Sequence, residues 1–331
     1  MRPNAAFCIA AVLIAAVLAI APLARAAEQG VGVAELTPDA ERAIQKGLEW
    51  LIQNQNGDGS WGTSYKTAST ALGLMAFMVK GYFPDRPPYG DPLSKAVNYL
   101  LSQASAHRGY MGTSMYEHGL ATLALSEVWG MSHSDDIRDA LKSAVDVILR
   151  SQNPAGGWRY QPVPNDADIS VTVMQIVALA SAREAGIFVP DTVIQKAIDY
   201  VISCQSQPSG GFCYQPGGGP GFARTAAGVM SLMMCGQRGT APVKAGLDYL
   251  KSQPENVFEA ADGFFFYAHY YAAQAMYQAG DAYYQDWYSR IRDSILKKQT
   301  DGSWADAQNI GTPMAVLILG IPYRFLPIYQ R

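Results

Sequence analysis

From about residue 40 onward, hydrophobic positions follow two patterns that alternate along the chain. In the first, apolar residues recur at helical spacing with polar and charged residues between them, as at Ile194, Ala197, Ile198 and Val201. The second is apolar almost all round, as in residues 171–182. A helix of the first kind buries one face, whereas a helix without a polar face is buried on every side. The chain therefore predicts an all-α fold in which outer and inner helices alternate.

A glutamine at the end of each outer segment shows that these helix pairs are repeats. The glutamines are Gln55, Gln103, Gln152, Gln205, Gln253 and Gln299. Their spacing of about fifty residues, kept over six copies, is typical of a repeat architecture. Six outer and six inner helices predict a closed (α/α)6 barrel, and an open solenoid is the alternative.

A glycine-rich turn follows each glutamine. The pattern Q-x-x-x-G-x-W occurs at Gln55–Trp61 and Gln152–Trp158, and Gln299–Trp304 is one residue shorter. The fourth copy has Phe212 in place of tryptophan, and the second and fifth copies are degenerate at Gly109-Tyr110 and Gly263-Phe264. Glycine permits a tight turn, and an indole covers it while its N–H finds a carbonyl. The predicted structural repeat residues are Gln55, Trp61, Gln152, Trp158, Gln299 and Trp304.

These turns resemble the QW repeat of the squalene cyclase and protein prenyltransferase β-subunit superfamily, the α/α toroids. The resemblance covers about residues 35–331 and implies one prenyltransferase and squalene-oxidase-repeat domain, in an exported bacterial member with a single barrel. It is specific for the fold and much less specific for the chemistry.

The first 26 residues have the features of a signal peptide. Arg2 precedes an uncharged apolar run at 5–21, and Ala24-Arg25-Ala26 supplies a cleavage pattern of small residues. We expect export to the periplasm or the exterior, with a retained membrane anchor as the alternative. An exported protein could also meet a membrane surface.

Composition and cysteine spacing narrow the classes of partner. With 25 Lys+Arg against 28 Asp+Glu, there is no basic excess to attract nucleic acid.

Cys204 and Cys213 flank a turn and are candidates for a disulfide in an oxidising compartment, with two free thiols as the alternative. The sequence has no C-x-x-C or H-E-x-x-H motif, so we expect no metal site and no cofactor. It does not predict an oligomeric state.

The cyclases of this superfamily protonate their substrate with the middle aspartate of a D-x-D-D motif, which follows a G-G-W turn. In the corresponding place, Asp166 and Asp168 match the first two acidic positions, and Ile169 replaces the last aspartate. Resemblance therefore makes Asp168, with Asp166, the candidate catalytic acid. The alternative is that Asp168 caps an inner helix that begins at Ile169.

The prenyltransferases of the superfamily hold zinc with an aspartate, a cysteine and a histidine. His269 stands roughly where the family has its histidine, but residues 221–228 lack the D-x-C pair. We therefore expect neither zinc nor prenyl transfer.

Polar and aromatic residues near the starts of the inner helices are the candidates for a binding site. When Thr70, Gly119, Val173, Ala227 and Ala272 are set at equivalent positions of their helices, these polar and aromatic residues fall into two rings. Both rings lie at the helix N-termini, where helix dipoles favour anions or polar groups. The binding candidates are Tyr65, Tyr116, Glu117, His118, Arg224, Tyr267, His269 and Tyr270. Two alternatives remain: these side chains line a pocket or plug the barrel, and Glu117-His118 is either an acid–base pair or a structural one.

Together these features predict an exported α/α toroid that binds a hydrophobic or isoprenoid small molecule or lipid in a central cavity. The first alternative is a squalene-type terpenoid cyclase with Asp168 as general acid. The second is a secreted polysaccharide-active (α/α)6 enzyme that uses Glu117 and Asp168 as its two carboxylates.

Overall fold

The computed structural model describes residues 36–132, 134–306 and 310–329 of the chain, all within the compact unit 33–331. The predicted signal peptide at 1–26 lies outside the described residues. In the described part, thirteen α-helices and three short 3₁₀ turns account for the regular structure, and there is no β-strand. The all-α prediction is confirmed.

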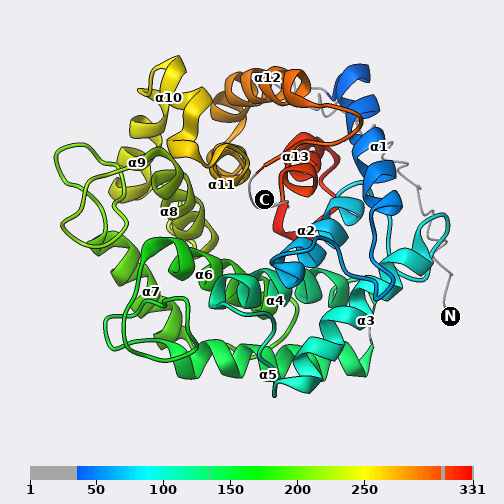
Figure 1. The fold of residues 1–331 in the computed structure, drawn as a ribbon. Coiled ribbons are helices and arrows are strands. Elements are labelled where there is room, and N and C mark those ends of the chain that lie inside the picture. The colour runs from blue at the N-terminus through cyan, green and yellow to red at the C-terminus, as the bar shows by residue number, and fades with distance from the viewer. Residues whose placement is uncertain (1–35, 133, 307–309, 330–331) are drawn as a thin grey trace, which may run out of the picture. The chain divides into compact units, whose positions relative to one another are not determined.

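Six helices form an outer ring and six form an inner ring, alternating along the chain (Figure 1). The outer helices are α1 (Pro38–Gln53), α3 (Gly90–Ala106), α5 (Asp135–Ser151), α7 (Asp191–Ser203), α9 (Ala241–Lys251) and α12 (Asp281–Lys298). The inner helices are α2 (Lys66–Met78), α4 (Met115–Trp129), α6 (Ile169–Glu184), α8 (Phe222–Met234), α11 (Phe265–Ala279) and α13 (Gly311–Gly320). A short additional helix, α10 (Glu255–Ala260), precedes α11.

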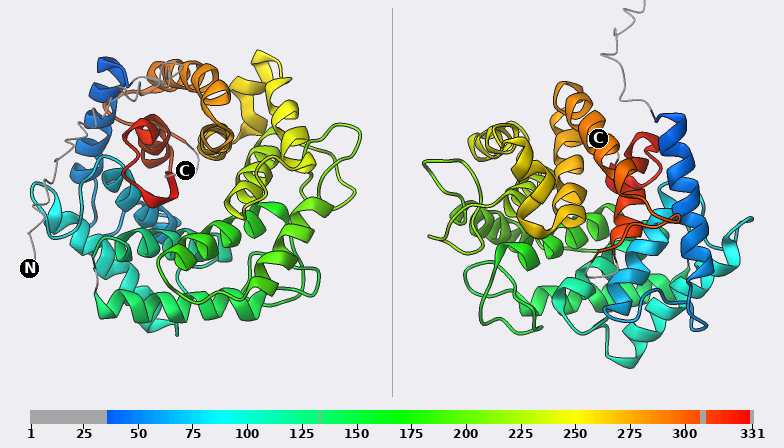
Figure 2. Two further views of the ribbon diagram at one scale, coloured as in Figure 1. Left: turned by 180° about the vertical axis from the view of Figure 1, so that it is seen from behind. Right: turned by 45° about the horizontal axis from the view of Figure 1, so that its top comes forward.

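The inner ring is closed. Each inner helix packs against the next, and α13 packs against α2 to complete the circle. The two rings are visible from both ends of the barrel and in the tilted view (Figure 2). At the seam the Gln299 side chain donates a 2.9 Å hydrogen bond to the Ala43 carbonyl of α1. The barrel is therefore an (α/α)6 toroid and not an open solenoid.

The turn glutamines join neighbouring repeats. The Gln152 Nε2 donates to the Gly156 carbonyl in its own turn and to the Val193 carbonyl in the next outer helix, both at 2.9 Å. Gln55, Gln205 and Gln299 make the same pair of bonds. One amide therefore ties each of these turns to one of the first two turns of the neighbouring outer helix.

The turn tryptophans lie between an outer and an inner helix. The Nε1 atoms of Trp61, Trp158 and Trp304 donate to carbonyls near the end of the preceding outer helix at 2.7–2.8 Å. Their backbone N–H groups donate to threonine hydroxyls on the following inner helix. All three rings are at most 2% exposed, and their polar atoms are satisfied inside the core.

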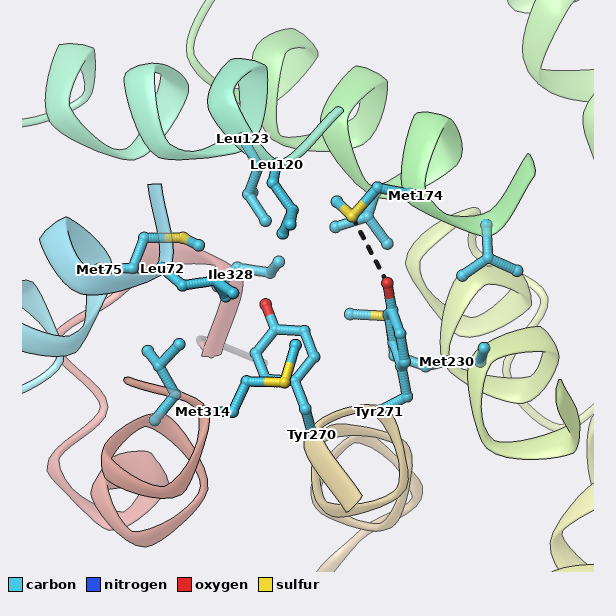
Figure 3. Packing of buried hydrophobic residues seen from close by; sticks show 14 of the residues in the cluster. Leu72, Met75, Leu120, Leu123, Met174, Met230, Tyr270, Tyr271, Met314 and Ile328 are labelled. Atoms are coloured by element: carbon cyan, nitrogen blue, oxygen red, sulfur yellow. Dashed lines mark hydrogen bonds between the residues drawn. The ribbon is translucent and has the colours of Figure 1, made fainter. Parts of the chain in front are cut away.

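Below the starts of the inner helices, side chains fill the middle of the barrel (Figure 3). This filling comes from all six inner helices and the C-terminal segment, and includes Leu72, Met75, Leu120, Leu123, Met174, Met230, Tyr270, Tyr271, Met314 and Ile328. The plug expected as an alternative to a pocket is thus present over this part of the barrel. The middle of the barrel is therefore occupied by side chains at this level.

Cys204 and Cys213 lie opposite each other across the fourth turn, where the Cys213 N–H donates to the Cys204 carbonyl at 2.8 Å. Both side chains are buried, and both are free thiols in the structure, as is Cys235. Burial raises the pKa of Cys204 to about 11, so its thiol holds its proton at neutral pH. The described residues thus contain no bond at the predicted disulfide position.

Candidate functional site

A cavity of about 680 Å³ opens where the inner helices begin. Its size is in the range of sites for small molecules. All six inner helices, or the residues just before them, contribute side chains, and the loops after the third and fourth turns complete the wall. The lining residues are Tyr65, Ala68, Ser114, Tyr116, Glu117, Leu120, Tyr160, Ser170, Tyr214, Ala223, Arg224, Phe264, Tyr267 and Ile310.

Aromatic side chains form the rim of this cavity. Tyr65, Tyr160 and Phe264 are 57%, 44% and 51% exposed, and they are among the few large hydrophobic side chains in the described residues that face solvent. The Tyr160 and Tyr214 hydroxyls are 3.0 Å apart, and Arg159 lies over both rings at 5.7 and 5.6 Å from their centroids. The cation thus holds the two tyrosines as a pair.

Sequence reasoning missed Tyr160, Tyr214 and Phe264. A signal for the first two was available, because each follows the turn aromatic by two residues, Tyr160 after Trp158 and Tyr214 after Phe212. The loops that carry them lie beside the inner-helix starts: the Met115 N–H donates to the Tyr160 carbonyl, and the Ile169 N–H donates to the Tyr214 carbonyl.

Tyrosines also form the floor. The Tyr116 hydroxyl is 3.2 Å from the Tyr271 hydroxyl, which donates to the Met174 sulfur at 3.4 Å. The Tyr267 and Tyr271 rings meet edge to face at 5.0 Å. Burial raises the pKa of Tyr116 and of Tyr271 well above the usual tyrosine value. The floor is therefore uncharged, and through Tyr271 it is continuous with the plug.

Two charged residues line the cavity. Glu117 is 3% exposed, and its Oε1 accepts hydrogen bonds from the Thr113 N–H at 3.1 Å and the Thr113 hydroxyl at 2.6 Å. Arg224 lies in the first turn of α8, after the N-cap Gly221. Of the predicted binding residues, Tyr65, Tyr116, Glu117, Arg224 and Tyr267 thus line this cavity.

His118 does not line the cavity, contrary to the expectation from its neighbour Glu117. Its Nδ1 accepts from the Met111 N–H at 3.1 Å, which leaves Nε2 to donate to the Ala144 carbonyl at 3.1 Å. It is fully buried, and burial lowers its pKa to about 4. Both nitrogens are used between the inner and outer rings. Of the two alternatives for Glu117-His118, the structural one therefore applies: His118 holds two backbone groups and does not face a ligand.

His269 and Tyr270 also lie away from the cavity lining. His269 packs among the rings of Phe258, Phe265 and Trp287, and its Nε2 lies 3.0 Å from the Phe258 carbonyl. Burial lowers its pKa to about 4, so the ring is neutral. Tyr270 belongs to the plug below the floor (Figure 3). These corrections share a cause: both residues lie on buried faces of α11.

Asp168 is the N-cap of α6. Its Oδ1 accepts from the Val171 N–H at 3.0 Å, and its Oδ2 lies 3.5 Å from the Arg159 Nε. The side chain is fully buried, and burial raises its pKa, while the Val171 N–H, Tyr214 and Arg159 favour its ionised form. Asp166 pairs with Arg159 at 2.7 Å at the surface. Neither aspartate is among the residues that line the cavity.

Other site types find no support in the described part of the chain. Nowhere in it do three or more His, Cys, Asp or Glu side chains gather so that they could hold a metal ion. None of its helices combines the length and the hydropathy needed to span a membrane.

The comparisons with known proteins agree with this architecture. Residues 93–194 match the model of the prenyltransferase alpha-alpha toroid domain. No curated protein matches the chain. The match covers the second and third repeats, which contribute Tyr116, Glu117 and Ser170 to the cavity.

Solved structures match over most of the chain. An inactive variant of an alpha-1,6-mannanase of Salegentibacter sp. HEL1_6, in complex with alpha-1,6-mannotriose, has a TM-score of 0.66 at 8% identity, covering 86% of this chain and 99% of that one. A variant of the type II terpene cyclase MstE from Scytonema, in complex with its substrate geranylgeranyl dihydroxybenzoate, has a TM-score of 0.60 at 16% identity, covering 87% and 98%. Together with the family model, these matches confirm the α/α-toroid fold that the turns predict. At these identities the likeness establishes the fold.

Proposed function

We propose that this toroid is a binding protein for a largely apolar small molecule of isoprenoid type, which it holds at the aromatic mouth of the barrel. The observation that carries the proposal is the cavity of about 680 Å³ with an aromatic rim and an uncharged tyrosine floor. Aromatic faces hold hydrocarbon chains by contact area and without directional bonds. We further propose, from the leader at 1–26, that the protein acts after export.

A binding role fits the cavity better than either catalytic role. A cyclase needs its acid in contact with the substrate, and Asp168 is buried as a helix cap behind the wall. Glycoside hydrolysis uses two carboxylates that flank the bond, and Glu117 is the one carboxylate among the described residues of the lining. The matching mannanase variant is inactive after replacement of two neighbouring aspartates, and the part of the lining that the structure describes holds no such pair.

Calorimetric titration with farnesol and geranylgeraniol tests the proposal, with a variant that fills the cavity. Ser170→Trp places an indole in the lining, and Ser102→Trp places one on the exposed face of α3 as the matched control. We expect wild type and Ser102→Trp to bind a prenol and Ser170→Trp to lose at least ten-fold in affinity. Equal binding by all three proteins, or no binding by wild type, would overturn the proposal.

Product analysis separates binding from catalysis. Wild type and Asp168→Asn are incubated with linear polyprenes, and the extracts are searched for cyclic products. We expect unchanged polyprene from both. A cyclic product from wild type that is missing with Asp168→Asn would establish a cyclase in place of a binding protein.

A further inference from the structure

Arg224 is the one cation among the described residues that line the cavity. It stands at the third position of α8, so its charge lies near the positive end of the helix dipole. The guanidinium folds back over Gly221: a Cβ added to Gly221 would lie 2.2 Å from the Arg224 Nη2. The absent side chain at Gly221 therefore provides the space in which this guanidinium rests.

No carboxylate in the described part of the chain neutralises Arg224. The ion pairs found there use other cations, such as Arg159 with Asp166 and Arg290 with Glu255. Arg224 interacts electrostatically with the Tyr267 hydroxyl and the Cys213 thiol, and burial raises the pKa of both. Both are thus neutral at physiological pH. A half-buried guanidinium in a mostly apolar cavity lacks a counter-ion.

The first turn of α8 adds a second preference for negative charge. On α4 and α6, the Ser114 and Asp168 side chains accept hydrogen bonds from first-turn N–H groups. The N-cap of α8 is Gly221, which has no side chain to do this. A ligand oxygen beside Arg224 would meet the guanidinium and the positive end of α8 together.

We propose that the ligand of this cavity carries a single carboxylate on an apolar body, and that Arg224 binds the carboxylate. This inference rests on the proposed binding function and specifies its ligand class. One arginine matches one carboxylate bidentately. A group with several negative charges would need several cations, and the other charged side chain in the described lining is the Glu117 carboxylate, which would repel it.

The test compares farnesoic acid, farnesol and farnesyl diphosphate, which share the same hydrocarbon chain, in titrations of the full chain. We expect wild type to bind the acid at least ten-fold more tightly than the alcohol, and more tightly than the diphosphate. Arg224→Gln should lower affinity for the acid by about 10- to 100-fold, as expected for a lost charge-assisted hydrogen bond. Its affinity for farnesol should fall by less than its affinity for the acid, and a urea-unfolding midpoint equal to that of wild type shows that the variant is still folded.

Two further variants probe the geometry. Arg224→Lys keeps the charge and loses the planar fork, so it should recover part of the affinity for the acid. Gly221→Ala must displace the guanidinium without removing it, because the new Cβ would overlap Nη2. It should weaken acid binding and leave farnesol binding unchanged.

The outcomes distinguish a failure of the carboxylate inference from a failure of the proposed binding function. If acid and alcohol bind equally and Arg224→Gln changes neither, the carboxylate inference is wrong and the binding function stands. If the diphosphate binds most tightly, the restriction to a single charge is wrong. If none of the three probes binds wild type, the binding function fails, and the carboxylate inference fails with it.

Discussion

At the scale of single residues, the turn aromatics show how a polar atom can be placed in the core. The Trp158 Nε1 donates to the Ile148 carbonyl at 2.8 Å, and its backbone N–H donates to the Thr172 hydroxyl at 3.0 Å. The fully buried indole thus connects an outer helix with an inner helix. In the second repeat Met111 occupies the turn position, and its N–H donates to His118 in place of a threonine.

Replacing Trp158 by alanine should therefore destabilise the protein strongly. The change removes a large buried side chain and leaves a cavity, which costs about 3–5 kcal/mol. Urea unfolding measures the loss, with replacement of the partly buried Trp50 of α1, at the edge of the core, by alanine as control. The control should lose less. A loss at Trp158 below about 1 kcal/mol would show that the turn tolerates a missing indole.

Asp168→Asn should change stability little. Asparagine is about as good an N-cap as aspartate, and its side-chain oxygen can accept from the Val171 N–H in the same way. We expect a loss below about 1 kcal/mol for Asp168→Asn and about 0.5–2 kcal/mol for Asp168→Ala, which removes the acceptor. Urea unfolding of Asp168→Asn and Asp168→Ala measures the two losses. Equal losses would mean that the negative charge beside Arg159 contributes more to stability than the hydrogen bond of the cap.

At the scale of elements, the turn glutamines carry the contact from one repeat to the next. Gln152 bonds a carbonyl in its own turn and one at the start of α7. Gln253 ends the fifth outer helix but bonds the Tyr249 carbonyl of its own helix and its neighbour Ser252. The chain thus contains a bridging glutamine and a comparable one without a bridge.

Gln152→Ala should therefore cost more stability than Gln253→Ala. Losing two hydrogen bonds to partly buried carbonyls costs about 1–3 kcal/mol, whereas Gln253→Ala loses contacts near the surface and should cost about 0.5 kcal/mol or less. Unfolding both variants in urea gives the comparison. Similar losses would contradict the bridging role of the glutamine.

The helices and the ring could be predicted because the apolar periodicity and the recurring glutamine are local patterns, each visible within a single repeat of the sequence. The relative register of the inner helices could not. Setting Gly119 and Val173 level with Thr70 misplaces them by one residue, because the turn hydrogen bonds place His118 and Thr172 at that level. One residue turns a helix by about 100°, and His118 accordingly faces the outer ring although its neighbour Glu117 lines the cavity.

The cavity residues that were predicted are mostly those in the first helical turn. Tyr116, Arg224 and Tyr267 lie near the starts of their helices, where a position near the mouth is set by the turn itself. Tyr160 and Phe264 come from loops, whose course depends on tertiary contacts such as the hydrogen bond from the Met115 N–H to the Tyr160 carbonyl. Helical periodicity carries no information about them.

At the scale of the whole barrel, the two ends differ. The end where the inner helices begin holds the cavity, and the C-terminal segment contributes Ile328 to the plug beneath it (Figure 3). Glu127 of α4 is 1% exposed. Its Oε1 accepts from the Ser181 hydroxyl at 2.8 Å, and its Oε2 accepts from the Ile328 N–H at 3.3 Å. One carboxyl therefore links α4, α6 and the C-terminal segment.

This carboxyl should make stability depend on pH. Burial raises the pKa of Glu127 from 4.5 to about 7 in the folded protein, so the folded state binds the proton more tightly than the unfolded state does. Its contribution is complete below pH 4.5 and is lost as the pH rises through 7. At about 1.4 kcal/mol per pKa unit, the loss is on the order of 3 kcal/mol.

Glu127→Gln keeps an amide of the same shape and cannot ionise, so its stability should lack this decline. Urea unfolding at pH 5 and pH 8 compares it with wild type and with Glu49→Gln, at an exposed position of α1, as control. We expect wild type and the control to lose stability between the two pH values relative to Glu127→Gln. Parallel pH dependence in all three proteins would mean that Glu127 is already ionised at pH 5, with its charge satisfied by Ser181 and the Ile328 N–H.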